Sequence, residues 1–357
     1  MRTEAEEQKN TRSAACSATD GPLIDVRGLR QFFPIKSGLL QRTVGHVRAV
    51  DGVTFKINCG ETMGLVGESG CGKTTVGRSI LHLYKPTDGT VHFDGTDLAS
   101  LPVKKLRALR PQIQLIFQDP YSSLSPRMPV GEIIGEAVRQ HRIVPKGDYR
   151  SYIIKTMGDC GLQPHYIDRY PHEFSGGQRQ RICIARALAL KPRFIVCDEP
   201  VSALDVSIQA QIINLMRDLQ REYGLTYLFI SHDLSVVEHI SDTVGVMYLG
   251  TIVESAPKRD LYSNALHPYT QALLSSAPVS DPAAKADRQI LQGELPSPAN
   301  PRPGCKFHTR CQLCVELCKR EQPALSDAGG GHMVACHLVH RPELRNGGRE
   351  ANSKEAS

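Results

Sequence analysis

The sequence has no apolar run long enough to cross a membrane as a helix. Its longest stretch without a formal charge, residues 261–280, contains two prolines and several polar side chains, whereas a helical span needs about 20 mostly apolar residues. The first ten residues carry three glutamates and lack the apolar segment of a secretory signal. We therefore expect a protein that stays in the cytoplasm and has no transmembrane helix of its own.

Strong net charge and internal repeats are also missing. The 43 lysines and arginines exceed the 37 aspartates and glutamates by only 6, and the charges are spread along the chain, so we expect no nucleic-acid partner. With 40% hydrophobic and 22% charged residues in 357, the chain is neither disordered nor fibrous. A length near 350 residues predicts about two domains.

Short apolar runs alternate with stretches of helical spacing through the middle of the chain. This alternation predicts a parallel sheet with right-handed crossovers. A proline-broken segment at 119–172 has helical apolar spacing and predicts a helical insertion. The expected strands are 23–26, 53–57, 62–66, 113–117, 194–197 and 227–230, with a hairpin at 91–95, a long loop at 36–45, and helices at 73–83, 178–190 and 208–219.

A phosphate-binding loop lies between an expected strand and an expected helix. Residues 67–74 read GESGCGKT, which fits the pattern G-x-x-x-x-G-K-[ST]. Glycines let backbone N–H groups cradle phosphate oxygens, and the helix N-terminus adds partial positive charge. Lys73 would contact the β- and γ-phosphates, and Thr74 would hold Mg²⁺. The predicted ATP contacts are Gly67, Glu68, Ser69, Gly70, Cys71, Gly72, Lys73, Thr74 and Thr75.

Two carboxylates follow the apolar strand expected at 194–197. Asp198 suits a Mg²⁺ contact, direct or through water, and Glu199 suits a base that polarises the attacking water. Acidic pairs also occur at ordinary strand ends, but downstream of a phosphate loop the catalytic interpretation is favoured.

Residues 174–181, FSGGQRQR, resemble the signature motif of ABC transporter ATPases. A hydroxyl and two glycines that open a helix form a second anion site. In that family the site, here Ser175, Gly176, Gly177 and Gln178, meets the γ-phosphate held by the opposite subunit. A phosphate-loop kinase would lack this motif.

The resemblance assigns further residues by their motifs. Gln118 matches the glutamine that senses Mg²⁺ and water, and Asp205 ends the SALD segment that crosses the dimer interface. His232 matches the switch histidine that would contact the γ-phosphate. Phe33 matches the aromatic residue that stacks on adenine, although the adjacent Phe32 leaves open which ring belongs to the core.

Four more segments, 119–127, 168–173, 199–202 and 267–274, are similar to the dipeptide/oligopeptide (and nickel) importer ATPases, closest to the second, dipeptide-type subunit. The resemblance spans about 22–340. It implies an ATPase that powers peptide uptake from the cytoplasmic face of the (inner) membrane as a peripheral subunit. The implied partners are a second homologous ATPase in a heterodimer, two permease subunits and a periplasmic or extracellular solute-binding protein. The segment after Gln118 would receive the permease coupling helix.

Other functions remain as alternatives. The importer could carry nickel or another small solute. A DNA-repair ABC ATPase would need a long coiled coil between Thr75 and Ser175, and none is present. A translation-associated ABC protein usually carries two cassettes, whereas this chain has one phosphate loop and one signature.

Cysteines cluster near the C-terminus, with five of the eleven inside 32 residues. In a reducing compartment, such a cluster indicates a metal site before a disulfide set. Within the resemblance, the pattern C-x₅-C-x₆-C-x₁₇-C of Cys305, Cys311, Cys318 and Cys336 implies a [4Fe–4S] cluster. Structural zinc, which could use His308, His332 or His337, and uncoordinated thiols remain alternatives, and Cys314 leaves the ligand set open. Cys71, Cys183 and Cys197 are interpreted as packing residues.

The implied fold is α/β: a P-loop (RecA-like) nucleotide-binding domain with a β subdomain and a helical subdomain, plus a small Cys-rich C-terminal extension. We expect a disordered tail at 1–20 and the ATPase domain at 21–256, with its helical subdomain at about 119–184. After Pro257, proline and serine predict a linker into the extension, 257–340, which carries the cysteines. A second disordered tail is expected at 341–357.

Overall fold

A computed structural model describes residues 21–38, 41–276, 293, 296–299 and 301–344. The tail expected at 1–20, and all but the first four residues of the one expected at 341–357, lie outside these ranges. The chain divides into two compact units. Unit 1 comprises Met1–Asp25, Lys56–Thr62 and Val91–Ser231, and unit 2 comprises Val26–Phe55, Met63–Thr90 and His232–Ser357.

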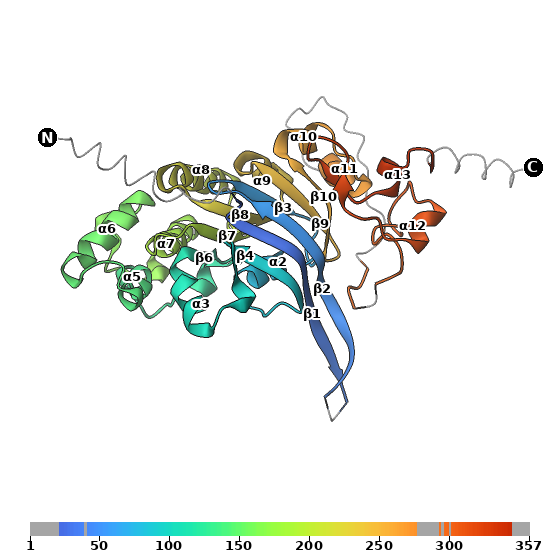
Figure 1. Ribbon diagram of the computed structural model, residues 1–357. Helices are drawn as coiled ribbons and strands as arrows, with labels where there is room; N and C mark the ends of the chain where they lie inside the picture. The colour runs from blue at the N-terminus through green and yellow to red at the C-terminus, as the bar shows by residue number, and fades with distance from the viewer. Residues whose placement is uncertain (1–20, 39–40, 277–292, 294–295, 300, 345–357) are drawn as a thin grey trace, which may run out of the picture. The chain divides into compact units, whose positions relative to one another are not determined.

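Unit 1 contains three parallel strands in the order β8-β7-β6 (Figure 1). They are β6 (Ile113–Ile116), β7 (Phe194–Asp198) and β8 (Thr226–Ser231), and every residue of β7 and β8 is buried. Such continuous apolar runs are what a parallel sheet covered on both faces requires. The expected strands and their parallel pairing are therefore confirmed.

Helices make up most of the rest of unit 1. The apolar positions that predicted the insertion, including Ile133, Ile134 and Met157, are buried, and α5, α6 and α7 pack on one another. The helices are α3 (Val103–Leu109), α4 (Pro120–Ser123), α5 (Val130–His141), α6 (Tyr149–Asp159), α7 (Gly176–Leu188) and α8 (Val206–Tyr223), with 3₁₀ turns η1 (Leu98–Ser100), η2 (Arg110–Gln112), η3 (Lys146–Asp148), η4 (Pro164–Tyr166) and η5 (Pro171–Glu173).

The main sheet of unit 2 has the strand order β11-β12-β10-β9-β3. β3 is parallel to β9, and the other neighbours are antiparallel, so the sheet is mixed. The strands are β3 (Thr62–Val66), β9 (Thr243–Tyr248), β10 (Thr251–Pro257), β11 (Ser326–Asp327) and β12 (Met333–Val334), and helices α2 (Lys73–Ile80) and α9 (Leu234–Ile240) accompany them.

The long loop expected at 36–45 is instead mostly strand. β1 (Ile24–Ser37) and β2 (Arg42–Ile57) run side by side (Figure 1), and Gln41 N donates to Gly38 O at 3.1 Å; residues 39 and 40 lie outside the described ranges. Side chains at the far end of the hairpin are mainly exposed. The sequence there therefore lacks the alternation of apolar and polar residues that predicts a strand. β1 also neighbours β4 (Asp88–Phe93), and β4 pairs with β5 (Thr96–Asp97) as the predicted hairpin.

The prediction of a linker after Pro257 is also wrong for residues 258–276. This stretch forms α10 (Lys258–Ser263) and α11 (Pro268–Ser276), because Leu261, Tyr269 and Ala272 are buried and anchor the two helices. Pro268 is tolerated because it begins a helix, where its missing N–H costs nothing. Residues 277–292 lie outside the described ranges. Two short helices, α12 (Glu316–Arg320) and α13 (His337–His340), lie among the cysteines.

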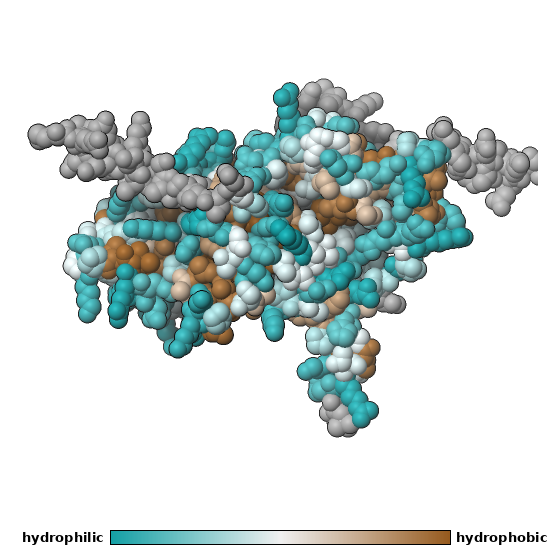
Figure 2. Space-filling view, in the orientation of Figure 1, coloured by the Kyte–Doolittle hydropathy of each residue, from teal (hydrophilic) through white to brown (hydrophobic). Residues whose placement is uncertain are grey.

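Hydrophilic residues cover most of the face seen in Figure 2, with hydrophobic areas scattered among them. Large exposed apolar side chains include Phe117, Tyr121 and Val206, which are 40%, 59% and 81% exposed. No helix in the described part of the chain is both long and apolar enough to cross a membrane.

Candidate functional site

The phosphate loop runs from the end of β3 to the start of α2, and two of its glycines have no room for a side chain. A Cβ on Gly67, at φ 153°, would lie 2.2 Å from Met247 O, and one on Gly72, at φ 109°, would lie 2.1 Å from Ala49 O. Both obstacles are backbone atoms. The loop is therefore shaped by close backbone packing that only glycine permits.

Lys73 is the first residue of α2 and is only 4% exposed. Its Nζ donates to Gly67 O at 2.7 Å and to Glu68 O at 3.0 Å. Gly72 caps the helix without a side-chain hydrogen bond, and the first turn has no acidic residue. Uncapped N–H groups and a buried ammonium fit a phosphate group, and the hydroxyl of Thr74 beside them fits Mg²⁺.

Cys71 lies inside this loop and is 1% exposed. Burial raises the pKa of its thiol, and the nearby Lys73 ammonium only partly opposes that shift. The side chain is therefore a protonated thiol at neutral pH and packs as a small apolar group. Cys183 and Cys197 are likewise buried with raised thiol pKa values, for which burial is the largest cause.

In unit 1, the carboxyl end of β7 brings Gln118 and Glu199 together. Gln118 Nε2 donates to Glu199 Oε2 at 3.0 Å, although 81 residues separate them. Glu199 has φ 46°, in the left-handed region, and its N–H donates to Ile230 O at 3.0 Å. Such a conformation is costly for a non-glycine residue and is typical of functional sites. Asp198, which ends β7, is 1% exposed.

The signature segment begins α7. Ser175 is its N-cap: Gln178 N donates to Ser175 Oγ at 3.4 Å, and Ser175 N donates to Gln178 Oε1 at 3.1 Å. A Cβ on Gly177 would lie 2.6 Å from Ile208 Cγ2, in α8. Asp205 is the N-cap of α8 and makes no capping hydrogen bond with its side chain. A Cβ on Gly176 would lie 3.4 Å from Leu204 Cδ2, so the signature and the SALD segment lie against each other.

The remaining predicted residues belong to unit 2. His232 directly follows β8 in the sequence. The Phe33 ring makes an edge contact with Tyr84, centroids 5.4 Å apart, whereas Phe32 contacts the Arg48 guanidinium at 5.7 Å. Both rings are half-buried, so their burial does not choose between them. The phosphate loop, His232 and Phe33 form the unit 2 set, and Gln118, Asp198, Glu199, the signature and Asp205 form the unit 1 set.

The four predicted cysteine ligands line one small cavity in unit 2, together with His308 and His337. Burial, the largest cause, and the neighbouring thiols raise the pKa of Cys305 to about 11 and that of Cys311 to about 12. Cys305 N also donates to Cys318 O at 2.7 Å. Four thiols match the ligand number of a metal centre, although no group of three metal-binding side chains in the described ranges is arranged to hold a metal ion.

Other candidate ligands are engaged elsewhere. His332 Nε2 lies 2.7 Å from Glu254 Oε1, and Glu254 is completely buried. His337 Nε2 is 3.0 Å from Glu321 O, and His308 Nδ1 is 2.7 Å from Cys305 O. Cys314 is half-buried, and its Sγ donates to Val315 O at 3.6 Å. Of the three histidines suggested for zinc, His332 has the firmest alternative role.

Comparison with known proteins places two family matches on the chain. Residues 50–202 match the family described as ABC transporter, and residues 253–318 match the oligopeptide/dipeptide transporter C-terminal region. The chain is 55% identical over 325 residues to the oligopeptide transport ATP-binding protein AppF of Bacillus subtilis, covering 90% of this chain and 99% of AppF. It is 53% identical over 318 residues to a putative peptide import ATP-binding protein of Brucella ovis, covering 89% and 98%.

Solved structures give the same fold. The dimeric, post-hydrolysis ATP-binding cassette MJ0796 bound to ADP and Pi matches with a TM-score of 0.59 and 26% identity, over 66% of this chain and 99% of that one. The structure of cbiO1 from Clostridium perfringens, part of the ABC transporter complex cbiONQ, matches with a TM-score of 0.59 and 25% identity, over 69% and 92%. The chain therefore has the ABC ATPase cassette fold.

Proposed function

The chain belongs to the ATP-binding subunits of oligopeptide/dipeptide ABC transporters and is the ATP-binding subunit of a peptide importer. On this premise, we propose a role in ATP binding or hydrolysis for each predicted site residue. Residues 67–75 hold the phosphates of ATP, with Lys73 as the principal cation. Thr74, Gln118 and Asp198 are the Mg²⁺ ligands, and Phe33 stacks on the adenine. Mg²⁺, when bound, neutralises charge on the β- and γ-phosphates.

The hydrolytic roles fall to three side chains. Glu199 accepts a proton from the attacking water, and His232 contacts the γ-phosphate. Gln118 orients the Glu199 carboxylate and the water relative to each other. Ser175, Gly176, Gly177, Gln178 and Asp205 act across a dimer interface on the nucleotide bound by the other ATPase. The observation that carries this assignment is the 3.0 Å hydrogen bond between Gln118 and Glu199, because it joins two separately predicted motifs.

Replacing Glu199 tests the assignment. Glu199→Gln keeps the shape and the hydrogen-bonding capacity but removes the base, so we expect a loss of turnover of about a hundredfold or more and an ATP-bound dimer trapped on size-exclusion chromatography. Glu222→Gln makes the same chemical change at an exposed position of α8 and should hydrolyse ATP normally. Normal turnover in Glu199→Gln would remove Glu199 from this role.

The proposed assembly is a heterodimer with a second homologous ATPase, on the cytoplasmic face of the membrane, beneath two permease subunits that receive peptides from a solute-binding protein. The exposed Phe117 and Tyr121 flank Gln118 and would meet the permease coupling helix. The cargo is a dipeptide or a longer oligopeptide. Identifying the ligand of the associated binding protein decides between them.

We also propose that residues 257–340 form an extension beyond the ATPase domain of 21–256, and that its Cys305, Cys311, Cys318 and Cys336 hold a [4Fe–4S] cluster. Their shared cavity supports this, as does the absence of Cys314 from that cavity's lining. Four thiolates satisfy the ligand requirement of such a cluster. Zinc is the alternative.

The cluster is tested on protein purified without oxygen. We expect a brown protein with bound iron and sulfide. Cys318→Ser should lose both, whereas Cys314→Ser should keep them. A colourless protein with one zinc would overturn the cluster.

A further inference from the structure

Glu68, the second residue of the phosphate loop, is held at all three of its polar groups. Its carbonyl accepts from Lys73 Nζ at 3.0 Å, its N–H donates to Tyr269 Oη at 3.0 Å, and its carboxylate Oε2 accepts from Arg310 Nη1 at 2.9 Å. The first partner belongs to the loop itself. The other two come from the C-terminal region, 201 and 242 residues further along the chain.

Both C-terminal partners are rigidly placed. Tyr269 is fully buried, and its ring contacts Tyr248 and Phe307 at centroid distances of 4.8 and 5.4 Å. The Arg310 side chain is 7% exposed, and its guanidinium lies 5.9 Å from the centre of the Tyr248 ring. Because a buried arginine is costly without its partner, the pair with Glu68 is strongly enforced.

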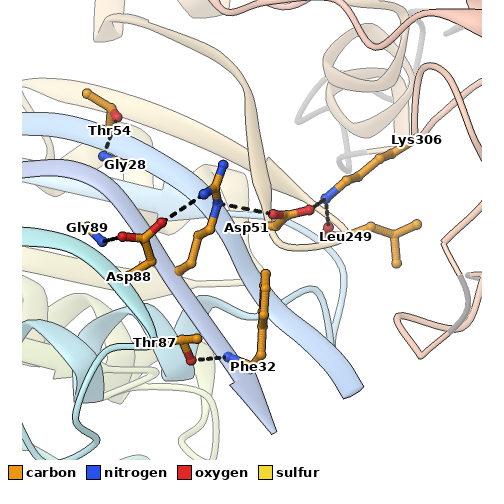
Figure 3. Close-up of polar contacts among 10 residues, drawn as sticks. Gly28, Phe32, Asp51, Thr54, Thr87, Asp88, Gly89, Leu249 and Lys306 are labelled. Carbon is orange, nitrogen blue, oxygen red and sulfur yellow. Dashed lines mark hydrogen bonds and ion pairs between the residues drawn. The ribbon is translucent and has the colours of Figure 1, made fainter. Parts of the chain in front are cut away.

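A second buried cation anchors the same segment four residues earlier. Lys306, also 7% exposed, donates from Nζ to Asp51 Oδ2 at 2.9 Å and to Leu249 O at 3.0 Å (Figure 3). Asp51 is in turn 3.7 Å from Arg30 Nε, and Arg30 Nη1 reaches Asp88 at 2.8 Å. The segment that carries Arg310 therefore cannot shift without breaking this network.

The carboxylate of Glu68 would repel a phosphate bound in this loop, because like charges repel most strongly where water is excluded. Arg310 neutralises that carboxylate and turns it toward the C-terminal region. Tyr269 fixes the backbone of the same residue. Together these contacts hold the Glu68 carboxylate on Arg310 and fix the Glu68 backbone, so that Lys73 Nζ contacts the carbonyl oxygen of Glu68 rather than its carboxylate.

We propose that Arg310 and Tyr269 are positioning residues for the phosphate loop, so that the affinity for ATP depends on the C-terminal region through Glu68. The inference rests on the phosphate-binding role proposed for residues 67–75. It extends that role, because it makes the segment between Cys305 and Cys311 part of the support of the nucleotide site.

Nucleotide affinity of the full chain, measured with a fluorescent ATP analogue, tests the proposal. Arg310→Met should weaken binding about tenfold, as expected for loss of a charge-assisted hydrogen bond, while Arg310→Lys should recover part of the loss. The matched control Arg320→Met removes an arginine that is 73% exposed and paired with Glu316, and it should bind like the wild type. Tyr269→Phe removes one hydroxyl and should weaken binding about threefold.

A double-mutant comparison separates positioning from general damage. If Arg310 acts through Glu68, then Arg310→Met should have little further effect in a Glu68→Gln background. An effect equal to that of Arg320→Met, or an undiminished effect in the Glu68→Gln background, overturns the proposal. Lys73→Ala is measured in parallel: normal ATP binding in that variant would instead overturn the proposed phosphate site.

Discussion

The phosphate loop and the signature segment both place glycines at a helix N-terminus, but their backbones are supported differently. In the phosphate loop, Gly67 and Gly72 have positive φ and press against backbone carbonyls, and no side chain caps α2. In the signature, Ser175 and Gln178 cap each other across the first turn of α7. The first loop is shaped by close packing of its glycines against backbone atoms. The second is held by two hydrogen bonds between Ser175 and Gln178, which it would have to exchange for a phosphate in the role proposed for it.

Replacing one glycine of the phosphate loop and one glycine of the signature with alanine should give the largest difference in stability and in ATP binding. Gly72→Ala would place a Cβ 2.1 Å from a backbone oxygen, so we expect about 3 kcal/mol of lost stability and no detectable ATP binding. Gly176→Ala has its nearest atom, a side-chain carbon of Leu204, at 3.4 Å, so its effect on folding stability and on ATP binding by the separate chain should be small. Urea unfolding and nucleotide binding measure both, and equal losses would remove the contrast.

Acidic pH should destabilise the region that supports the phosphate loop, through His267, and should not act through Ser175 and Gln178 of the signature. Burial lowers the pKa of His267 to about 3 from 6.5, and its Nδ1 accepts from the N–H of Tyr269 at 3.1 Å. Below pH 6.5 the unfolded chain binds a proton that the folded chain does not. The free energy of unfolding should therefore fall by up to about 1.4 kcal/mol per pH unit between pH 6.5 and 3, and this group should have no effect above pH 6.5.

His267→Asn keeps an acceptor for the N–H of Tyr269 but removes the titrating group. Urea unfolding of both proteins from pH 7 to 5 isolates the histidine, because the other titrations are shared. We expect the variant to have the flatter profile. Parallel profiles would show that His267 does not control the pH dependence. Ser175 and Gln178 have no group that titrates in this range.

A side chain at Gly177 should clash less severely than one at Gly72, and a second substitution should relieve the clash. A Cβ there would lie 2.6 Å from Ile208 Cγ2, but a side chain can move where a carbonyl cannot. We expect Gly177→Ala to cost about 1–2 kcal/mol. Adding Ile208→Ala should relieve part of this cost in a double-mutant cycle by urea unfolding. Strict additivity would mean that the two residues do not meet.

The smallest effect is expected at Cys71. A buried thiol with a raised pKa is a poor nucleophile, so inactivation by N-ethylmaleimide should be slow and should differ little between the wild type and Cys71→Ser. Rapid, ATP-protected inactivation that disappears in Cys71→Ser would show instead that the loop opens and exposes this residue.

Residue patterns predicted those parts of the fold that local chemistry controls. The buried strands at 62–66, 194–197 and 227–230 appear as continuous apolar runs, so their positions could be predicted. The far end of the β1–β2 hairpin, at 36–45, could not be predicted, because its exposed strands pair through backbone groups that every sequence carries. Helices α10 and α11 were missed because their prolines and serines resemble a linker until burial of Leu261 and Tyr269 is seen.

The family, the phosphate loop and the signature followed from contiguous residues, because glycines, a lysine and a helix start act within a single turn of chain. The partners of those residues did not. Arg310 meets Glu68 across 242 residues, and Gln118 meets Glu199 across 81. Nothing in the spacing singles out one arginine among the 43 basic side chains. An ion pair is chosen by which surfaces pack together and exclude water, and that choice exists only after the chain has folded.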